Sequence, residues 1–282
     1  AKLIYVLLIL SIIGFIVMQV HHRYRMHQKM LQHIHAEQIN EAKLQFFINI
    51  SHEIRTPMSL IISPLQQLMA KDKDAECRKL YSTIQRNAER ILQLVNQLMD
   101  IRKIDKGQMS LMFKKAEIVS FTRDLLETFE QQTRVKKLDL KFHTSAPEIE
   151  MWIDPKNFDK IILNLLSNAC KFTPENGQVE ISLSTGEDTH LPQNAPLRRY
   201  VELTVADSGI GIASTEREHI FERFYQIRNS QNNSNIGTGI GLHLTRSLVE
   251  LHYGNIHVED NGEGRPGSRF IIRLPLGNGH LK

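Results

Sequence analysis

The chain opens with an apolar stretch, after which apolar and polar positions alternate. Residues 3–20 carry no charge and have only a few weakly polar interruptions. A helix over this segment would be about 27 Å long, close to the roughly 30 Å hydrocarbon core of a bilayer. A buried core helix would show a polar face, and a signal peptide would have a shorter apolar region with a small-residue cleavage site. The pattern therefore favours a transmembrane helix.

Basic residues follow this segment directly, beginning with Arg23, Arg25 and Lys29. Lys and Arg beside a membrane span favour its cytoplasmic side. We therefore expect one span in the inner (cytoplasmic) membrane, with everything after it in the cytoplasm. Because the chain starts at Ala1 and enters the apolar segment almost at once, we also expect a further part to precede it.

Two helical patterns follow the apolar segment. From residue 21 to about residue 70, apolar residues recur at mostly three- to five-residue spacings, which is typical of a helix with one apolar face. The polar run at 71–74 predicts a turn, and a second helix continues over residues 80–101 until Gly107 ends it. Each apolar stripe needs more cover than the other helix provides, so two hairpins are expected to form a four-helix bundle in a homodimer.

The second half of the chain alternates helical and extended patterns. Asp154 followed by Pro155 predicts a helix start, because Asp is a good N-cap and Pro fits the first helical position. Helices are predicted over residues 117–135, 155–172 and 241–251, and strands over 138–143, 149–153, 178–184, 200–206, 255–259 and 268–274. The fold class is therefore α+β, with helices layered on a mixed sheet.

Composition narrows the class of protein only a little. The chain has 282 residues, enough for about two domains. Its net charge of +4 is spread along the sequence, so we expect no nucleic-acid partner. Two distant cysteines, Cys77 and Cys170, form neither a disulfide framework nor a metal pattern, which suits a reducing compartment.

The first predicted hairpin contains a histidine in a reactive setting. On a helix, His52 and Thr56 lie on one face, and Glu53 is next to His52. A neutral imidazole can attack phosphorus with one ring nitrogen while a carboxylate accepts the hydrogen of the other. Pro57 lacks an N–H and should loosen the helix close to His52. A solvent-facing histidine on an ordinary helix is the alternative, but it does not explain this combination.

A polar stripe runs along the helix predicted at 155–172. Asn164, Asn168 and Lys171 recur at helical spacing on an otherwise apolar helix. Amide oxygens can hold a hydrated Mg²⁺, and a lysine can meet phosphate oxygens. The alternative, that these are ordinary residues at a helix end, explains Lys171 but not Asn164.

Two shorter motifs follow, each weak by itself. Asp207, Gly209 and Gly211 come just after a predicted strand, where a carboxylate can accept a hydrogen bond from an exocyclic amine and glycines allow close approach to a flat ring. A plain turn would explain them equally well. Phe221 and Phe224 are three apart and could as easily belong to the core.

A glycine-rich run then opens the helix predicted at 241–251. It comprises Gly237, Thr238, Gly239, Gly241 and Leu242. Backbone N–H groups at a helix start attract phosphate. The Asn- and Ser-rich stretch before this run, residues 228–236, indicates a mobile lid. The sequence has no P-loop motif and lacks the third glycine of a dinucleotide fingerprint.

Taken in order, these motifs resemble those of bacterial two-component sensor histidine kinases. The residues around His52 resemble the H-box, and the later motifs resemble the N, G1, F and G2 boxes of the GHKL ATPase superfamily. The resemblance implies a dimerisation and phosphotransfer hairpin followed by an α/β-sandwich ATP-binding domain. Together with the apolar pattern at the start of the chain, it gives the segments 1–20 (transmembrane helix), 21–43 (linker helix), 44–110 (hairpin), 111–277 (ATP-binding domain) and 278–282 (tail).

The same resemblance assigns roles to residues. It implies ATP and Mg²⁺ as cofactors, with the metal on Asn168, and autophosphorylation of His52 with Glu53 as base. The expected partner is a receiver domain that accepts the phosphoryl group on an aspartate. This receiver would belong either to the same protein (a hybrid sensor) or to a separate one. Thr56 would support its dephosphorylation. Phe172 stands where many relatives have Tyr.

Two other functions remain open at this point. A signalling adaptor would bind nucleotide without transferring phosphate, but the intact His52, Glu53 and Asn168 argue against it. An ATPase of chaperone or topoisomerase type would have a glutamate at the place of Asn164, since asparagine cannot serve as general base.

Overall fold

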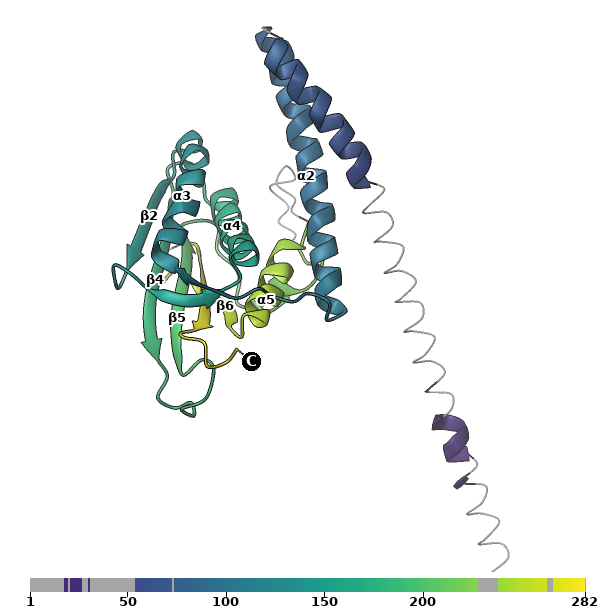
Figure 1. Ribbon diagram of the computed structural model, residues 1–282, viewed down its shortest axis with the longest axis vertical. Coiled ribbons are helices and arrows are strands. Elements are labelled where there is room, and N and C mark those ends of the chain that lie inside the picture. Colours follow the sequence, from purple (N-terminus) through teal and green to yellow (C-terminus); the bar gives the residue numbers. More distant parts are fainter. Residues whose placement is uncertain are drawn as a thin grey trace, which may run out of the picture. The chain divides into compact units, whose positions relative to one another are not determined.

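The computed structural model describes residues 18–19, 21–26, 30, 54–72, 74–227, 238–262 and 266–281. It divides into two compact units, Ala1–Val95 and Asn96–Lys282. The division falls inside the long helix α2 (Ala75–Asp105), which therefore contributes to both (Figure 1).

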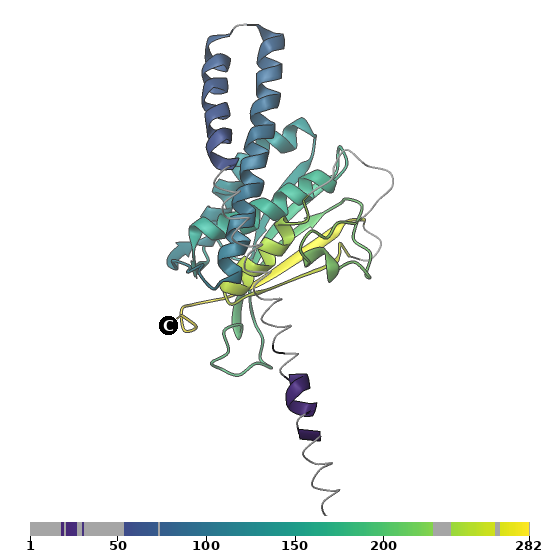
Figure 2. The same cartoon turned by 90° about the vertical axis from the view of Figure 1, so that its right-hand side faces the viewer.

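The first unit contains a helical hairpin. Residues 54–71 form one helix and α2 begins the other, and the two run side by side (Figure 2). Asp74 starts α2 by accepting the N–H of Glu76 at 2.8 Å, and the Tyr81 hydroxyl donates to Asp72 at 3.1 Å. The turn predicted here is confirmed at Asp72 and Asp74, which lie outside both helices.

The hairpin keeps only part of its apolar surface from solvent. Leu65, Ala88 and Val95 are buried. Large apolar side chains remain exposed on both helices, namely Leu60, Ile61, Leu68, Leu80, Ile84 and Ile91. This apolar surface agrees with the expectation that a hairpin of this pattern needs a second one for cover.

The predicted membrane span at 3–20 lies outside the described residues, apart from positions 18 and 19. Within the described part of the chain, no helix is both long and apolar enough to cross a bilayer.

The centre of the second unit is a mixed sheet, as predicted, and this sheet has five strands. Its order is β2-β4-β5-β7-β6, with β2 parallel to β4 and every other neighbour antiparallel. The strands are β2 (Asp139–Thr144), β4 (Gln178–Glu187), β5 (Arg199–Asp207), β7 (Ser268–Pro275) and β6 (Asn255–Asp260).

Three helices cover one face of this sheet (Figures 1 and 2). They are α3 (Ile118–Val135), α4 (Pro155–Phe172) and α5 (Gly241–Leu251), and a short 3₁₀ turn, η1 (His219–Phe221), precedes α5. The side of α4 turned inward is almost completely buried, with Phe158, Ile161, Ile162, Leu165 and Leu166 at most 1% exposed. The polar edge of α4 is thereby fixed in position above the sheet.

One small element is absent from the sequence prediction. Strand β1 (Lys114–Glu117) pairs antiparallel with β3 (Glu150–Ile153). The predicted helix at 117–135 begins one residue later, at Ile118, because Glu117 caps it. Its carboxylate accepts the N–H groups of Val119 at 2.9 Å, Ser120 at 2.6 Å and Ile149 at 3.0 Å.

These hydrogen bonds decide the charge state of Glu117. Burial alone would raise the pKa of Glu117, but the backbone donors, with Ile149 the strongest, outweigh it and hold the pKa at about 2. The carboxylate is thus charged in the folded protein at every ordinary pH.

We expect Glu117→Gln to lower the free energy of unfolding at pH 7 by about 1–2 kcal/mol, because the amide offers one acceptor in place of two. Unfolding can be followed through the single tryptophan, Trp152, which lies on β3. The matched control is Glu127→Gln, an exposed position on α3.

The cost of Glu117→Gln should depend on pH. The wild-type advantage is fully present above the ordinary pKa of 4.5 and is lost as the pH falls from there toward about 2, where the folded state protonates. A cost that stays the same across this range would contradict the capping role.

Candidate functional site

Helix α4 places the first predicted polar motif along one edge. Asp154 caps the helix by accepting the N–H of Asn157 at 3.2 Å, and Pro155 occupies the first helical position, both as predicted. Asn164 and Asn168 lie at the partly exposed edge of the helix. Amides in this position can reach a ligand at the surface while their helix stays anchored in the core.

The C-terminal end of α4 is held by two hydrogen-bonding residues. The fully buried Thr173 donates its hydroxyl to a carbonyl of the last turn at 2.6 Å, and the Lys136 ammonium donates to the carbonyl of Cys170 at 2.7 Å. The Lys171 ammonium lies 4.7 Å from the centroid of the Phe172 ring, and Phe172 is 43% exposed. A cation and a ring face are thus presented together.

Asp207 ends β5 as a buried carboxylate. Its Oδ1 accepts the N–H of Gly209 at 2.8 Å and that of Ser268 at 3.3 Å. Burial raises the pKa of Asp207 above its ordinary value, although the two backbone donors act against this. The second oxygen, Oδ2, can accept a further hydrogen bond from a ligand.

The backbone around Asp207 is packed without room for side chains. A Cβ on Gly209 would lie 2.6 Å from the carbonyl oxygen of Phe172 and 2.7 Å from Asp207 Oδ1, and Gly267, with φ +117°, packs on the Asp207 carbonyl. Asn261 donates its side-chain amide to that carbonyl at 2.9 Å. Sequence reasoning missed Asn261, although the Asn–Gly pair it belongs to is typical of a hairpin turn.

These residues fit the adenine end of a nucleotide. Phe172 and Ile210, the latter 67% exposed, offer apolar surface near Asp207. Gly211, with φ +73°, lets the backbone pass close to the Gly267 carbonyl. A flat ring with an exocyclic amine can lie on such surface and donate to the carboxylate.

The F and G2 motifs meet through their backbones. The N–H of Phe224 donates to the carbonyl of Gly239 at 2.9 Å, and both residues have positive φ, +62° and +69°. A Cβ on Gly239 would lie 2.5 Å from the carbonyl carbon of Phe224, a residue that is 62% exposed. Thr238 and Leu242 are partly exposed, and Gly237 lies outside the described residues.

Asn164 on α4 contacts α5 at two residues, Thr245 and the motif residue Gly241. Asn164 donates its amide to the hydroxyl of Thr245 at 2.7 Å. A Cβ on Gly241, the first residue of α5, would overlap Asn164 Oδ1. The structure thus brings Asn164 to the start of the glycine-rich helix, where the sequence predicts phosphate binding.

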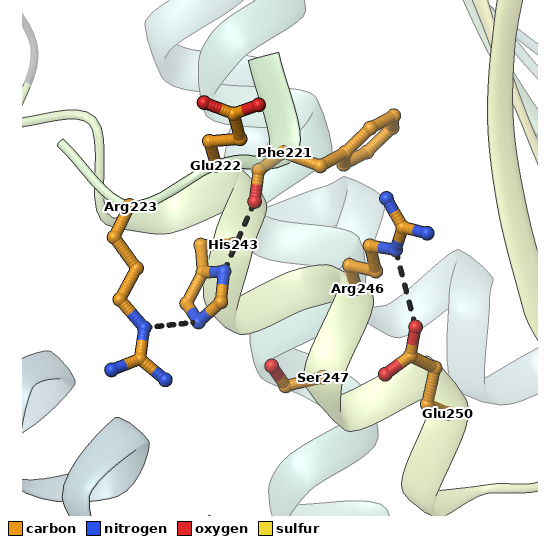
Figure 3. A pocket seen from close by; sticks show the side chains of 7 residues that line it. All are labelled: Phe221, Glu222, Arg223, His243, Arg246, Ser247 and Glu250. Carbon is orange, nitrogen blue, oxygen red and sulfur yellow. Dashed lines mark hydrogen bonds and ion pairs between the residues drawn. The ribbon is translucent and has the colours of Figure 1, made fainter. Parts of the chain in front are cut away.

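Phe221 lies in the core, the alternative to ligand binding for this residue. Its side chain is 4% exposed and packs edge-on against Phe270, with ring centroids 6.4 Å apart. It also borders a shallow pocket of about 450 Å³ (Figure 3), lined by Phe221, Glu222, Arg223, His243, Arg246, Ser247 and Glu250. Asp207, Asn168 and Lys171 do not line this pocket.

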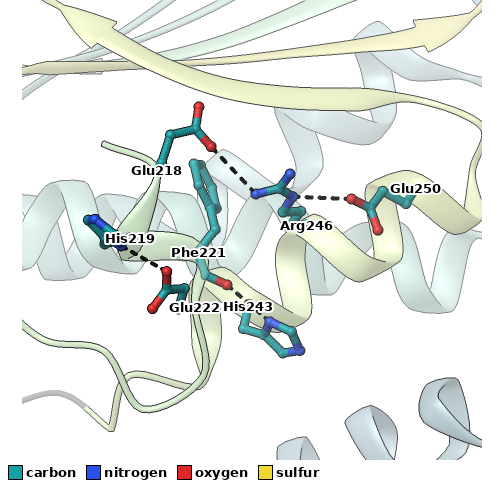
Figure 4. Close-up of polar contacts among 7 residues, drawn as sticks. All are labelled: Glu218, His219, Phe221, Glu222, His243, Arg246 and Glu250. Atoms are coloured by element: carbon teal, nitrogen blue, oxygen red, sulfur yellow. Dashed lines mark hydrogen bonds and ion pairs between the residues drawn. The ribbon is translucent and has the colours of Figure 1, made fainter. Parts of the chain in front are cut away.

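The charged groups of that pocket pair with one another or with close neighbours (Figure 4). Arg246 is 3.1 Å from Glu250 and 3.9 Å from Glu218. Arg223 donates to Nε2 of His243 at 2.8 Å, so His243 donates its Nδ1 hydrogen to the carbonyl of Phe221. Burial lowers the pKa of His243, with Arg223 acting in the same direction, which keeps the ring neutral. The pocket therefore offers little unpaired charge to a ligand.

The structure describes only part of the motif around the predicted phosphoacceptor, His52. His52 and Glu53 lie outside the described residues. Thr56 and Pro57 lie exposed on the helix of residues 54–71, within the first unit.

Two family profiles match the chain over most of its length. Residues 153–278 match the family described as "Histidine kinase-, DNA gyrase B-, and HSP90-like ATPase", and residues 42–107 match "His Kinase A (phospho-acceptor) domain". The buried Asp207 and the closely packed Gly209 and Gly267 beside it are called the Asp207 cradle below. The fold and this cradle thus define an ATP-binding domain of the class shared by these three groups of proteins. With the phospho-acceptor domain before it, the chain belongs to the histidine kinases.

Individual relatives agree with this assignment. "Histidine kinase P4" of Formosa agariphila is 33% identical over 280 residues, 97% of this chain and 19% of the relative. "Sensor histidine kinase TmoS" of Ectopseudomonas mendocina is 38% identical over 240 residues, 84% of this chain and 23% of the relative. The crystal structure of full-length ShkA in complex with AMPPNP superposes with a TM-score of 0.63 at 25% identity, over 82% of this chain and 45% of that one.

The chain therefore spans about a fifth of the length of each of these two curated relatives.

We expect Gly209→Ala to weaken ATP binding about tenfold or more, because the added methyl group would collide with the Phe172 carbonyl and displace Asp207. Binding of a fluorescent, non-hydrolysable ATP analogue measures the effect. Gly279→Ala is the control, since a Cβ there meets nothing within 4 Å. Equal affinities in the two variants would show that this cradle does not hold the base.

Proposed function

We propose that this chain is the kinase core of a longer sensor, in which the second unit binds Mg-ATP and delivers the γ-phosphoryl group to His52. The observation that carries the proposal is the Asp207 cradle beside the amide and lysine edge of α4, in one chain with a phospho-acceptor domain. The second unit would thus bind the phosphoryl donor, and the phospho-acceptor domain would supply the acceptor.

The residues of the second unit hold and orient the nucleotide. Asp207 accepts a hydrogen bond from the adenine amine, and the exposed Phe172 ring lies against the base. Asn168 is the proposed Mg²⁺ ligand through its amide oxygen, and Lys171 neutralises phosphate charge. Because asparagine at position 164 cannot act as a general base for water, ATP is retained until a better nucleophile is in line.

In the transfer step ATP supplies the phosphoryl group, and its bond to the ADP oxygen breaks as the ring nitrogen of His52 bonds to phosphorus. Glu53 accepts the hydrogen of the second ring nitrogen and so keeps the attacking nitrogen in its reactive form. The phosphohistidine then passes its phosphoryl group to an aspartate on a receiver domain, in cis or in trans. Thr56 assists when the receiver is later dephosphorylated.

Dimerisation and membrane attachment complete the proposal. The exposed apolar residues of the hairpin, such as Leu60 and Leu80, support a homodimer built on a four-helix bundle. The uncharged segment 3–20 and the basic residues after it support one span in the inner membrane, with the kinase core in the cytoplasm.

The decisive experiment is labelling with γ-labelled ATP and Mg²⁺. We expect acid-labile, base-stable label on the wild-type chain and none on His52→Gln, while nucleotide binding survives in both. The control is His143→Gln, because His143 is an exposed histidine on β2. Full labelling of His52→Gln would place the phosphoacceptor elsewhere.

Two further outcomes would contradict a kinase. Nucleotide binding without label would favour an adaptor, and fast release of free phosphate without label would favour an ATPase.

The metal role of Asn168 can be tested separately. Asn168→Ala should raise the Mg²⁺ concentration needed for half-maximal labelling about tenfold or more, because the metal loses its protein ligand. Ser167→Ala, at the exposed neighbouring position, is the control. An unchanged Mg²⁺ requirement in Asn168→Ala would remove this residue from the metal site.

A further inference from the structure

The hydrogen bond between Asn164 and Thr245 is unusual for its surroundings. Thr245 is 1% exposed and lies on the buried face of α5, between Leu244 and Leu248, which are also buried. A valine would fill the same space without a polar atom. The hydroxyl, however, accepts the Asn164 amide at 2.7 Å. The threonine therefore serves a contact that its apolar neighbours cannot make.

The oxygen of the Asn164 amide lies against α5 as well. Its Oδ1 occupies the space that a Cβ would take at Gly241, where α5 begins. One amide group thus touches α5 twice, at its first residue and one turn later at Thr245. Because α4 packs directly on α5, this group sets the spacing of the two helices at that point.

That spacing matters for a triphosphate. Asn168 and Lys171 follow Asn164 along α4, and the N–H groups of the first turn of α5 begin at Gly241. Both sets can grip one phosphate chain only if the two helices stay at the right separation.

We infer that Thr245 is a positioning residue for ATP: through Asn164 it holds the start of α5 at the separation from α4 that lets both helices bind the same triphosphate. This inference rests on the proposed kinase function and deepens it. Asn164 acts as a bridge between the helices, and Thr245 acts through it without touching the nucleotide.

Two substitutions at one position test the inference. Thr245→Val keeps the shape and removes the hydroxyl, whereas Thr245→Ser keeps the hydroxyl. We expect Thr245→Val to raise the dissociation constant for Mg-ATP about tenfold. Adenosine, which reaches Asp207 but has no phosphate, should bind Thr245→Val within about twofold of wild type. Thr245→Ser should behave as wild type toward both ligands. Ligand-observed NMR on the full chain measures the two affinities.

The comparison of ligands separates positioning from simple loss of structure. A merely structural role for Thr245 would weaken adenosine and ATP equally, and an unchanged ATP affinity in Thr245→Val would end the inference outright. If the wild-type chain itself binds no ATP, the proposed function fails. That result differs from both outcomes for Thr245→Val, which require a wild-type chain that binds ATP.

A double substitution provides an independent check if Thr245→Val folds poorly. Gly241→Ala should weaken ATP binding strongly in the wild-type background, because its methyl group collides with Asn164 Oδ1. In an Asn164→Ala background that collision is gone, so the factor by which Gly241→Ala raises the dissociation constant for ATP should be at least about fivefold smaller. The same cost in both backgrounds would show that Asn164 does not set the position of Gly241.

Discussion

The fold of the ATP-binding unit depends on the carboxylate of Asp154. Its two oxygens accept the N–H of Met112 at 2.9 Å, the N–H of Asn157 at 3.2 Å and the side-chain amide of Asn157 at 3.1 Å. The backbone N–H of Asp154 donates to Nε2 of His252, whose Nδ1–H donates to the carbonyl of Leu248 at 2.7 Å. One buried acid thus orders the segment after α2, the start of α4 and the end of α5. The polar edge of α4 inherits its position from this junction.

A comparison of Asp154 with Asp207 shows how two buried carboxylates acquire different tasks. Burial raises the pKa of both, but the donors around Asp154 outweigh it and leave its pKa below the ordinary value. Asp207 has two backbone donors, from Gly209 and Ser268, and its pKa stays raised. Asp154 is therefore saturated with internal partners and structural, whereas Asp207 retains capacity for a hydrogen bond from outside.

Local chemistry made much of this arrangement predictable from the sequence. The cap at Asp154, the start of α5 at Gly241 and six of the seven strands in the described part of the chain follow from periodicity and from turn residues. Strand β1 was missed because four residues with two lysines carry no apolar alternation. The partner of Asn164 could not be predicted either, since Thr245 lies 81 residues away and only the packing of two helices brings it near. The placement of His52 and Glu53 stays a prediction.

The last two turns of α2 have a practical consequence for dissecting this protein. Asp100 receives the Lys160 ammonium at 2.6 Å, and Asp105 pairs with Arg223. Both acids belong to the compact unit that begins at Asn96, well before residue 111, where the resemblance places the start of the ATP-binding domain. An excised ATP-binding fragment that started at the later point would lose both counter-ions and leave two cations of its own surface unneutralised. Proteolytic or recombinant dissection should therefore cut within the helix, near residue 96, and carry its final turns along as part of the globular piece.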